Sequence, residues 1–424
     1  MQLRLAYGRA GLEIMLPDAA PVTIIEPEFV AGLPDEETAI VAALRSPTGT
    51  LPLQELVQPS DRVAVVFSDL TRPMPNDRVL PPLLEELAMA GVRDEQIVLI
   101  NALGTHRPQT EAELRRMLGH SLVDRHRIPQ HDAWDRENLV EVARNRAGRP
   151  VYVHRAYVEA SVRILTGFIE PHFFAGFSGG PKAVLPGIAD IDAILDNHGA
   201  EMIAEPKATW AVTEGNPLWE EMRDVAQSTS PTFLLNVTLN QKRQITGVFA
   251  GELLQAHRAG VEFARQKVMR PVPERFDIVI TSNSGYPLDL NLYQAVKGMS
   301  AAALIVKPGG DIIVAAECWD GIPDHGEYKR LLWEAASPEE LLQRVMVPGF
   351  RCHDQWEAQI QAQIQQKAEV HVYADGLTDE ELRRALVIPC RSIEETVERI
   401  RRGKPEATIA VLPDGPQTVP IVRE

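Results

Sequence analysis

Residues 62–73 read RVAVVFSDLTRP, a short apolar run followed at once by polar side chains. The run is rich in valine and has the length of a buried strand. Similar strand patterns recur at 96–103 and 161–168, with helix patterns at 79–90 and from residue 110. Residues 232–240 and 244–252 suggest a hairpin. Alternating strands and helices predict an α/β fold with largely parallel sheets flanked by helices.

A domain boundary is predicted at residues 269–276. The chain has 424 residues, a length typical of two domains. The segment 269–276, MRPVPERF, contains two prolines and stands where the strand–helix alternation restarts. We therefore expect an N-terminal α/β domain over 1–270 and a C-terminal α/β domain over 271–424. The active site is expected in the cleft between them.

The composition narrows the class of protein. The net charge is −16, from 43 basic and 59 acidic residues, and nucleic acids and anionic membranes favour basic surfaces instead. The three cysteines, Cys318, Cys352 and Cys390, are odd in number and widely spaced, which disfavours a disulfide framework or a structural zinc site. No signal-like or membrane-spanning stretch is evident. These features predict a cytoplasmic protein and leave its oligomeric state open.

Three polar segments follow three of the predicted strands. They are SDLTRP at 68–73, LGTHRP at 103–108 and TGFIEPH at 166–172. Ligands of open α/β sheets bind beyond the carboxyl ends of the strands, so these segments are expected to converge on one site.

The polar segments supply Arg72, His106 and His172. Arg72 suits a carboxylate or phosphate, although a helix-capping cluster with a surface arginine is slightly favoured for SDLTRP alone. A histidine pair on converging loops suits proton transfer near pH 7. Taken singly, His106 is more often a hydrogen-bonded loop histidine and His172 a core histidine.

The segment GFSGGPK, at 176–182, offers a lysine in a glycine-rich loop. Its glycines allow a ligand to approach the backbone closely. The spacing matches neither the phosphate loop GxxxxGK[ST] nor the dinucleotide fingerprint GxGxxG. An apolar setting would favour a neutral, nucleophilic Lys182. The alternative is a lysine at a helix start that reaches solvent.

His198 stands at the end of a helix that Asp190 is expected to cap and Gly199 to end. It either bonds the last carbonyls of that helix or binds a metal. One histidine cannot hold a metal alone, so a metal role requires a cofactor that brings its own donors.

The C-terminal half adds polar and aromatic candidates. Tyr293, Gln294 and Lys297 stand on one predicted helix, and a spacing of three places Gln294 and Lys297 on one face. Such a face is usually solvated. Trp356 stands on a later helix, where simple packing is its ordinary role.

Five segments together give the chain a specific likeness to a known family. They are SDLTRP, LGTHRP, PHFFAGFSGGPK, NHG at 197–199 and YQAVKG at 293–298. The chain resembles the nickel-pincer-nucleotide-dependent lactate racemase family of 2-hydroxyacid racemases over essentially its full length.

The resemblance implies roles for individual residues. Lys182 would carry the cofactor covalently, as pyridinium-3-thioamide-5-thiocarboxylic acid mononucleotide, and His198 would be the protein ligand of Ni(II). His106 and His172 would be the acid/base pair, one for each face of the substrate. The residues implied to hold the substrate are Arg72, Gln294 and Lys297. Those implied to lie in the cofactor-binding region are Asp69, Thr71, Gly179, Gly180, Tyr293 and Trp356.

The implied function is that of an isomerase. A small 2-hydroxyacid would interconvert between its D and L forms through a 2-ketoacid, with hydride transfer to the nickel cofactor. Cofactor-building enzymes would be its partners. Two alternatives stay open: a racemase or epimerase of a larger 2-hydroxyacid, such as malate, 2-hydroxyglutarate or a sugar acid, and a non-catalytic nickel-cofactor-binding protein. A nicotinamide dehydrogenase is a more distant third.

Overall fold

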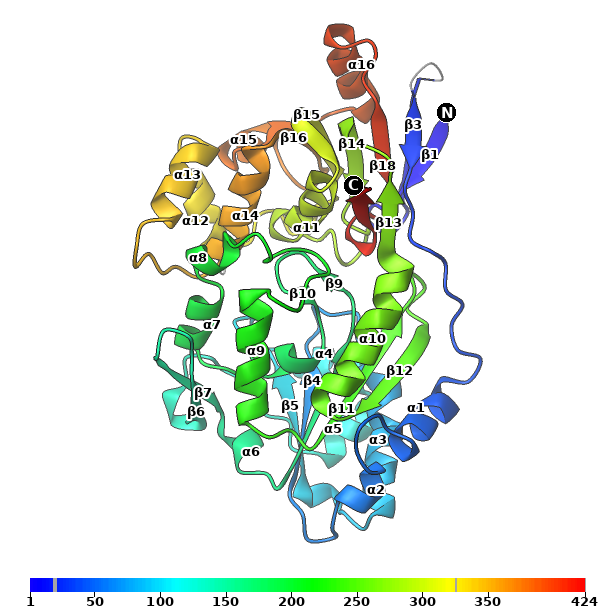
Figure 1. The fold of residues 1–424 in the computed structure, drawn as a ribbon, viewed down its shortest axis with the longest axis vertical. Helices are drawn as coiled ribbons and strands as arrows, with labels where there is room; N and C mark the ends of the chain where they lie inside the picture. The colour runs from blue at the N-terminus through cyan, green and yellow to red at the C-terminus, as the bar shows by residue number, and fades with distance from the viewer. Residues whose placement is uncertain (18–20, 325, 424) are drawn as a thin grey trace. The chain divides into compact units, whose positions relative to one another are not determined.

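The computed structural model describes residues 1–17, 21–324 and 326–423, and the chain forms two compact units (Figure 1). The N-terminal unit comprises Phe29–His198 and Pro206–Lys267. The C-terminal unit comprises Met1–Glu28, Gly199–Glu205 and Val268–Glu424. The described residues among 1–28, which the predicted boundary assigns to the N-terminal domain, thus belong to the C-terminal unit.

The N-terminal unit is built on a five-stranded sheet in the order β12-β11-β8-β4-β5. Its strands are β4 (Val63–Ser68), β5 (Ile97–Ala102), β8 (Val162–Phe168), β11 (Phe233–Leu239) and β12 (Ile245–Gly251). Neighbouring strands are parallel except for the β11/β12 pair, which confirms the predicted hairpin. From β4 the chain adds β5 on one side and then β8 on the other, so the order of strand addition reverses between the parallel strands β4 and β8. Ligands of α/β sheets bind at such a position.

Helices surround this sheet. Their bounds are α1 (Glu36–Arg45), α2 (Leu53–Leu56), α3 (Asn76–Met89), α4 (Glu111–Leu118), α5 (His120–Arg125), α6 (Arg155–Val158), α7 (Ile191–Asn197), α9 (Pro217–Ser228) and α10 (Leu253–Val268). Helix α3 begins before the predicted residue 79, and the Asn76 side chain anchors its start by donating to the Ser68 carbonyl at the end of β4. Alternate residues of β4 and one stripe of α3 form a shared apolar core.

Two small hairpins complete the N-terminal unit. Strands β6 (Leu139–Arg144) and β7 (Pro150–His154) form one, and β9 (Pro171–His172) and β10 (Gly176–Phe177) form the other. The β9/β10 hairpin follows β8 directly, so its residues belong to the carboxyl edge of the large sheet.

The C-terminal unit contains a six-stranded sheet in the order β17-β16-β15-β14-β18-β3, parallel throughout. Its strands are β3 (Val22–Ile24), β14 (Phe276–Ser282), β15 (Val306–Ala315), β16 (Ala368–Tyr373), β17 (Ile388–Pro389) and β18 (Ile409–Leu412). The paired strands β1 (Gln2–Leu5) and β2 (Leu12–Met15) and the pair β13 (Met269–Val272) and β19 (Val419–Val422) accompany it. The predicted α/β fold is confirmed.

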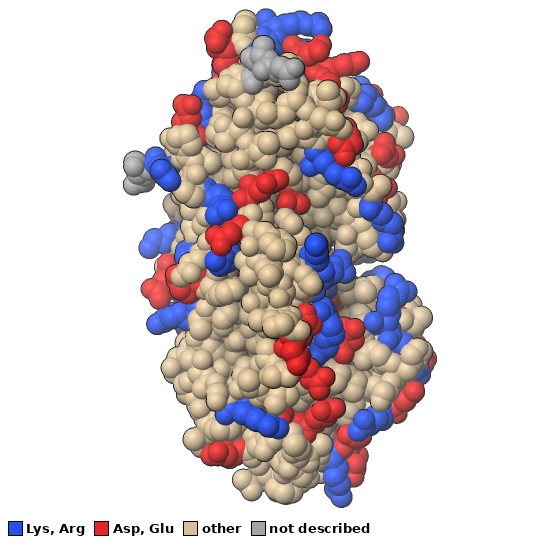
Figure 2. Space-filling view, turned by 90° about the vertical axis from the view of Figure 1, so that its right-hand side faces the viewer, with Lys and Arg blue, Asp and Glu red and all other residues tan. Residues whose placement is uncertain are grey.

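The helices of the C-terminal unit are α8 (Ala200–Ile203), α11 (Leu292–Ala303), α12 (Tyr328–Trp333), α13 (Pro338–Val345), α14 (Gln355–Gln365), α15 (Asp379–Arg384) and α16 (Ile393–Gly403). In the part of the chain that the structure describes, no helix has the length and apolar character needed to cross a membrane. Both acidic and basic side chains lie on the face shown in Figure 2.

Candidate functional site

The loops after β4 and β5 bring Asp69 and His106 together. The His106 Nδ1 atom lies 2.5 Å from Asp69 Oδ2. The Asp69 side chain is 1% exposed, whereas that of His106 is 32% exposed. The prediction that these loops converge is confirmed for this pair. Its geometry gives Asp69 an imidazole partner, a contact that the sequence did not reveal.

The neighbours of Asp69 keep its carboxylate charged. Burial opposes ionisation, but the charge and hydrogen bond of His106, the charge of Arg72 and the Thr71 hydrogen bond together lower the pKa of Asp69 below its usual value. Thr71 donates both its backbone N–H and its hydroxyl to Asp69 Oδ1, at 3.1 and 2.7 Å. The SDLTRP segment therefore surrounds a buried anion that faces an imidazole.

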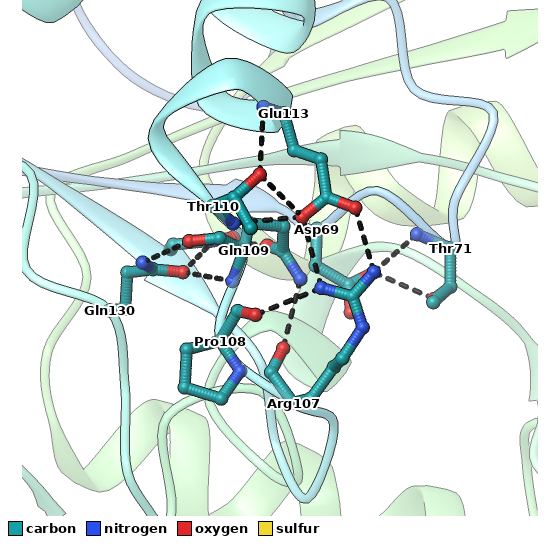
Figure 3. Close-up of polar contacts among 9 residues, drawn as sticks. Asp69, Thr71, Arg107, Pro108, Gln109, Thr110, Glu113 and Gln130 are labelled. Atoms are coloured by element: carbon teal, nitrogen blue, oxygen red, sulfur yellow. Dashed lines mark hydrogen bonds and ion pairs between the residues drawn. The ribbon is translucent and has the colours of Figure 1, made fainter.

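The segment that follows His106 is held by two sets of hydrogen bonds, drawn in Figure 3. In one set, Arg107 forms two parallel hydrogen bonds to the Glu113 carboxylate, at 2.9 and 2.7 Å. Thr110 and Glu113 form the predicted capping box of α4. In the other set, Gln130 accepts from the Gln109 backbone N–H and donates to the Gln109 carbonyl. These bonds restrict the backbone on which His106 is mounted.

A phenylalanine connects three of the other predicted residues. The Phe174 ring contacts the imidazole of His172, with 4.5 Å between ring centres. The His198 ring lies 5.2 Å from it, and the Lys182 Nζ atom lies 5.7 Å from the ring centre. Phe174 is buried. The structure thus gathers His172, Lys182 and His198 around one ring that the sequence reading did not single out.

The β9/β10 hairpin that presents His172 and Phe174 is anchored by its backbone. The Asn216 side chain, at the start of α9, donates to the Phe174 carbonyl at 2.8 Å. Gly176 has φ +75, and a Cβ there would lie 2.1 Å from the Val212 carbonyl oxygen. Only glycine permits both this conformation and this close approach.

The glycines before Lys182 face protein atoms. A Cβ on Gly179 would lie 2.6 Å from the Asn236 side chain, and one on Gly180 would lie 2.6 Å from His257. Asn236 also accepts the Gly180 N–H at 2.8 Å. Protein packing alone therefore requires glycine at both positions, and the inferred approach of a ligand to this loop stays a prediction. The loop needs glycine to pack on Asn236 and His257.

The end of α7 places His198 in the interior. Asp190 caps the helix by accepting from the Ala193 N–H, as predicted. Gly199 does not end the helix in the expected left-handed conformation: its φ is −66, and it stands at the start of α8. Burial, assisted by the Lys182 charge, lowers the pKa of His198 to about 3, so its imidazole is neutral at pH 7.

The candidates of the C-terminal unit form their own cluster on α11 and α14. Lys297 Nζ donates to Gln294 Oε1 at 2.9 Å, so the two side chains do share a helix face. Trp356 Nε1 donates to the Tyr293 hydroxyl at 3.0 Å. Tyr293, Gln294 and Lys297 are partly buried, and Trp356 is fully buried. The ordinary expectation for the helix face was full exposure to solvent.

One group of metal-ligand type occurs elsewhere among the described residues. Asp311, Glu369 and His371 lie on neighbouring strands β15 and β16. His371 Nε2 is 2.8 Å from Asp311 Oδ1. A hydrogen bond between these two side chains accounts for the arrangement.

Comparison with known proteins places the chain in a family. The family model of the lactate racemase N-terminal domain matches residues 7–211, and that of the lactate racemase C-terminal domain matches residues 272–420. The lactate racemase of Thermoanaerobacterium thermosaccharolyticum is 36% identical over 100% of this chain and 99% of its own length. The chain belongs to the lactate racemase family.

Further relatives agree with this membership. The lactate racemase of Lactiplantibacillus plantarum is 36% identical over 90% of each chain. The structure of the lactate racemase apoprotein from T. thermosaccharolyticum covers 100% of both chains, with a TM-score of 0.93 and 35% identity. The family resemblance drawn from the sequence is confirmed. The roles of individual residues stay predictions.

Proposed function

We propose that this lactate racemase family member is a racemase of 2-hydroxyacids, with lactate as its substrate, and that it carries a nickel-pincer nucleotide on Lys182. The observation that supports this most directly is the grouping of Lys182 and His198 around the Phe174 ring. These are the two side chains that would hold the cofactor and its nickel.

The chemistry of the donor groups fits such a cofactor. The lowered pKa of His198 leaves a neutral imidazole, the form that binds a metal. Imidazole suits Ni(II), and square-planar coordination is typical of this ion. A single protein ligand suffices because the pincer brings its own donor atoms. Lys182, half-buried beside an aromatic ring, offers an amine for the covalent link.

When bound, the cofactor would supply the acceptor and donor of the hydride at substrate C2. The rest of the chemistry belongs to side chains. His106 would take the hydroxyl proton of one enantiomer, and its imidazolium would be stabilised by the buried Asp69 carboxylate. His172 would serve the enantiomer whose hydroxyl points the other way. Arg72, Gln294 and Lys297 would hold the substrate carboxylate and oxygen.

The proposal includes cofactor-building enzymes as partners and a cytoplasmic location. The first follows from the proposed cofactor, which Lys182 and His198 would hold and separate enzymes would build. The second is supported by three free cysteines, of which Cys318 and Cys390 are buried, since reduced thiols persist in a reducing compartment.

Intact mass and nickel content test the proposal on protein co-produced with cofactor-building enzymes. Wild-type protein is expected to gain the mass of one nucleotide cofactor and about one nickel per chain, and Lys182→Ala to gain neither. An unmodified, nickel-free wild-type chain, under conditions that load a known lactate racemase, contradicts it. Loaded protein that leaves every 2-hydroxyacid unchanged would instead support the non-catalytic cofactor-binding alternative.

A further inference from the structure

The hydrogen-bond partner of His106 determines where its proton lies. A charged carboxylate accepts hydrogen bonds and does not donate them. Because Asp69 faces Nδ1 at 2.5 Å, a His106 ring that holds a single proton must carry it on Nδ1. Its other nitrogen, Nε2, then holds a lone pair and is ready to accept a proton.

The partner of His172 enforces the opposite arrangement. The backbone N–H of Ala175 points at His172 Nδ1, with 3.3 Å between the nitrogens. A backbone N–H only donates, so this Nδ1 must hold a lone pair and the ring proton must lie on Nε2. The β9/β10 hairpin creates this contact, because its turn folds Ala175 back over His172.

We infer that Asp69 is a positioning residue that leaves Nε2 of a neutral His106 ring as a proton acceptor, while the Ala175 amide holds a neutral His172 ring as a hydrogen-bond donor. This inference rests on the proposed function and deepens it. The two histidines present unlike nitrogens to the substrate, so the two enantiomers do not meet equivalent groups.

The proton balance shows what this asymmetry means. For the enantiomer whose hydroxyl faces His106, the hydroxyl O–H bond would break and its proton would join Nε2 of His106 as the C=O bond forms, while the bound cofactor would supply the acceptor for the C2 hydride. His172 acts as a proton acceptor at Nε2 only after its ring proton moves to Nδ1. That change places the Nδ1–H group of His172 against the Ala175 backbone N–H and breaks the hydrogen bond between them. The enantiomer that needs His172 as its base therefore starts at a disadvantage.

The substitution Asp69→Asn separates positioning from mere packing. Thr71 donates two hydrogen bonds to Asp69 Oδ1, so the amide oxygen of an asparagine would occupy that position. Its NH₂ group would then face His106 Nδ1 and demand a lone pair there. The variant should reverse the His106 tautomer while it keeps the size and the Thr71 contacts of the original side chain.

The test is ¹⁵N NMR of histidine-labelled protein without cofactor, with signals assigned from His106→Gln and His172→Gln. We expect an Nδ1–H tautomer for His106 and an Nε2–H tautomer for His172. Asp69→Asn should convert His106 to Nε2–H and leave His172 unchanged. Asp61→Asn, in a loop before β4, is the matched control and should change neither. An Nε2–H tautomer for His106 in the wild type, or its persistence as Nδ1–H in Asp69→Asn, overturns the inference.

Activity of the loaded enzyme provides the second readout. Asp69→Asn should lower kcat per bound nickel by about 10⁴-fold, the scale known for a carboxylate that orients a catalytic histidine. A wild-type kcat in this variant contradicts the inference. Loaded wild-type protein that fails to racemise any 2-hydroxyacid refutes the proposed function, whereas the NMR result judges the tautomers independently.

Discussion

The Lys182 amine lies 5.7 Å from the centre of the Phe174 ring, and the same ring contacts the imidazoles of His172 and His198. One buried aromatic side chain therefore contacts the predicted cofactor lysine, the predicted nickel ligand and one predicted acid/base histidine. Since the three belong to the hairpin β9/β10, the loop after it and the end of α7, Phe174 is where these segments meet.

Phe174→Leu is expected to reduce nickel loading at least about tenfold, because displacement of a reacting group by about 1 Å is costly to function. Its stability cost should be only about 1–2 kcal/mol, since leucine keeps most of the apolar volume. Nickel per chain, measured after co-production with cofactor-building enzymes, and the unfolding midpoint give the two values.

Phe276→Leu is the matched control for that substitution. Phe276 is equally buried, in β14 of the other unit, so its loss should cost similar stability and leave loading near the wild-type value. Equal loss of nickel in both variants would show that stability, and not the position of the ring, controls loading.

Gly180→Ala should disrupt the lysine loop more than its backbone conformation alone explains. Gly180 has φ +51, and an added Cβ would lie 2.6 Å from His257. Gly148 has φ +74 with no atom within 4 Å of such a Cβ. We expect Gly148→Ala to cost about 1 kcal/mol from backbone strain and Gly180→Ala to cost at least about twice as much. Urea unfolding measures both, and equal costs would refute the packing role of this glycine.

Arg107→Gln should affect catalysis far more than stability. The two hydrogen bonds from Arg107 to Glu113 hold the His106 loop, but the arginine side chain is 58% exposed, so the pair contributes at most about 1 kcal/mol. We expect kcat to fall roughly tenfold through misplacement of His106. Arg115→Gln, which removes a similar pair with Glu111 on α4, should leave kcat unchanged.

Buried histidines predict destabilisation by acid. Burial lowers the pKa of His257 to about 4 from an ordinary value of 6.5, and burial likewise lowers the pKa of His131 to about 4. A histidine whose pKa is depressed in the folded state binds its proton more readily when unfolded. The free energy of unfolding should therefore fall as pH drops from about 6.5 to about 4, by on the order of 3 kcal/mol at most per histidine.

Replacement of His257 identifies its share of this effect. His257→Gln should reduce the slope of the unfolding free energy against pH between pH 6.5 and 4, because one of the titrating histidines is gone. The exposed His120 provides the control, and His120→Gln should leave the slope as it is. An unchanged slope in His257→Gln would mean that His257 is protonated in the folded protein with little penalty.

Strong local patterns explain why much of the fold was predictable. The valine-rich run of β4, the hairpin β11/β12 and the capping box at Thr110 and Glu113 each have a pattern that neighbouring residues determine. The pairing of β3 with β18 joins residues almost 400 positions apart. No local pattern specifies such a contact, so the placement of β3 in the C-terminal sheet could not be predicted from neighbouring residues.

In the candidate site, too, some features were predictable from local sequence and others depend on the folded chain. Parallel strands made the meeting of the Asp69 and His106 loops predictable, but the choice of Asp69 as the imidazole partner depends on side-chain orientation. No motif in the sequence marks Phe174, Asn236 or His257. Their roles follow from their contacts in the folded chain. The glycines of the lysine loop stood out in the sequence, but their contacts with Asn236 and His257 could not be predicted from it.

A chiral lactate assay on nickel-loaded protein tests the central claim most directly. The account predicts that pure L-lactate and pure D-lactate both convert to the same racemic mixture, that Lys182→Ala abolishes both conversions, and that His106→Ala and His172→Ala each abolish turnover while nickel stays bound. Nickel-loaded wild-type protein that leaves both enantiomers of lactate unchanged would contradict lactate as its substrate. Full activity in either histidine variant would contradict the acid/base assignment.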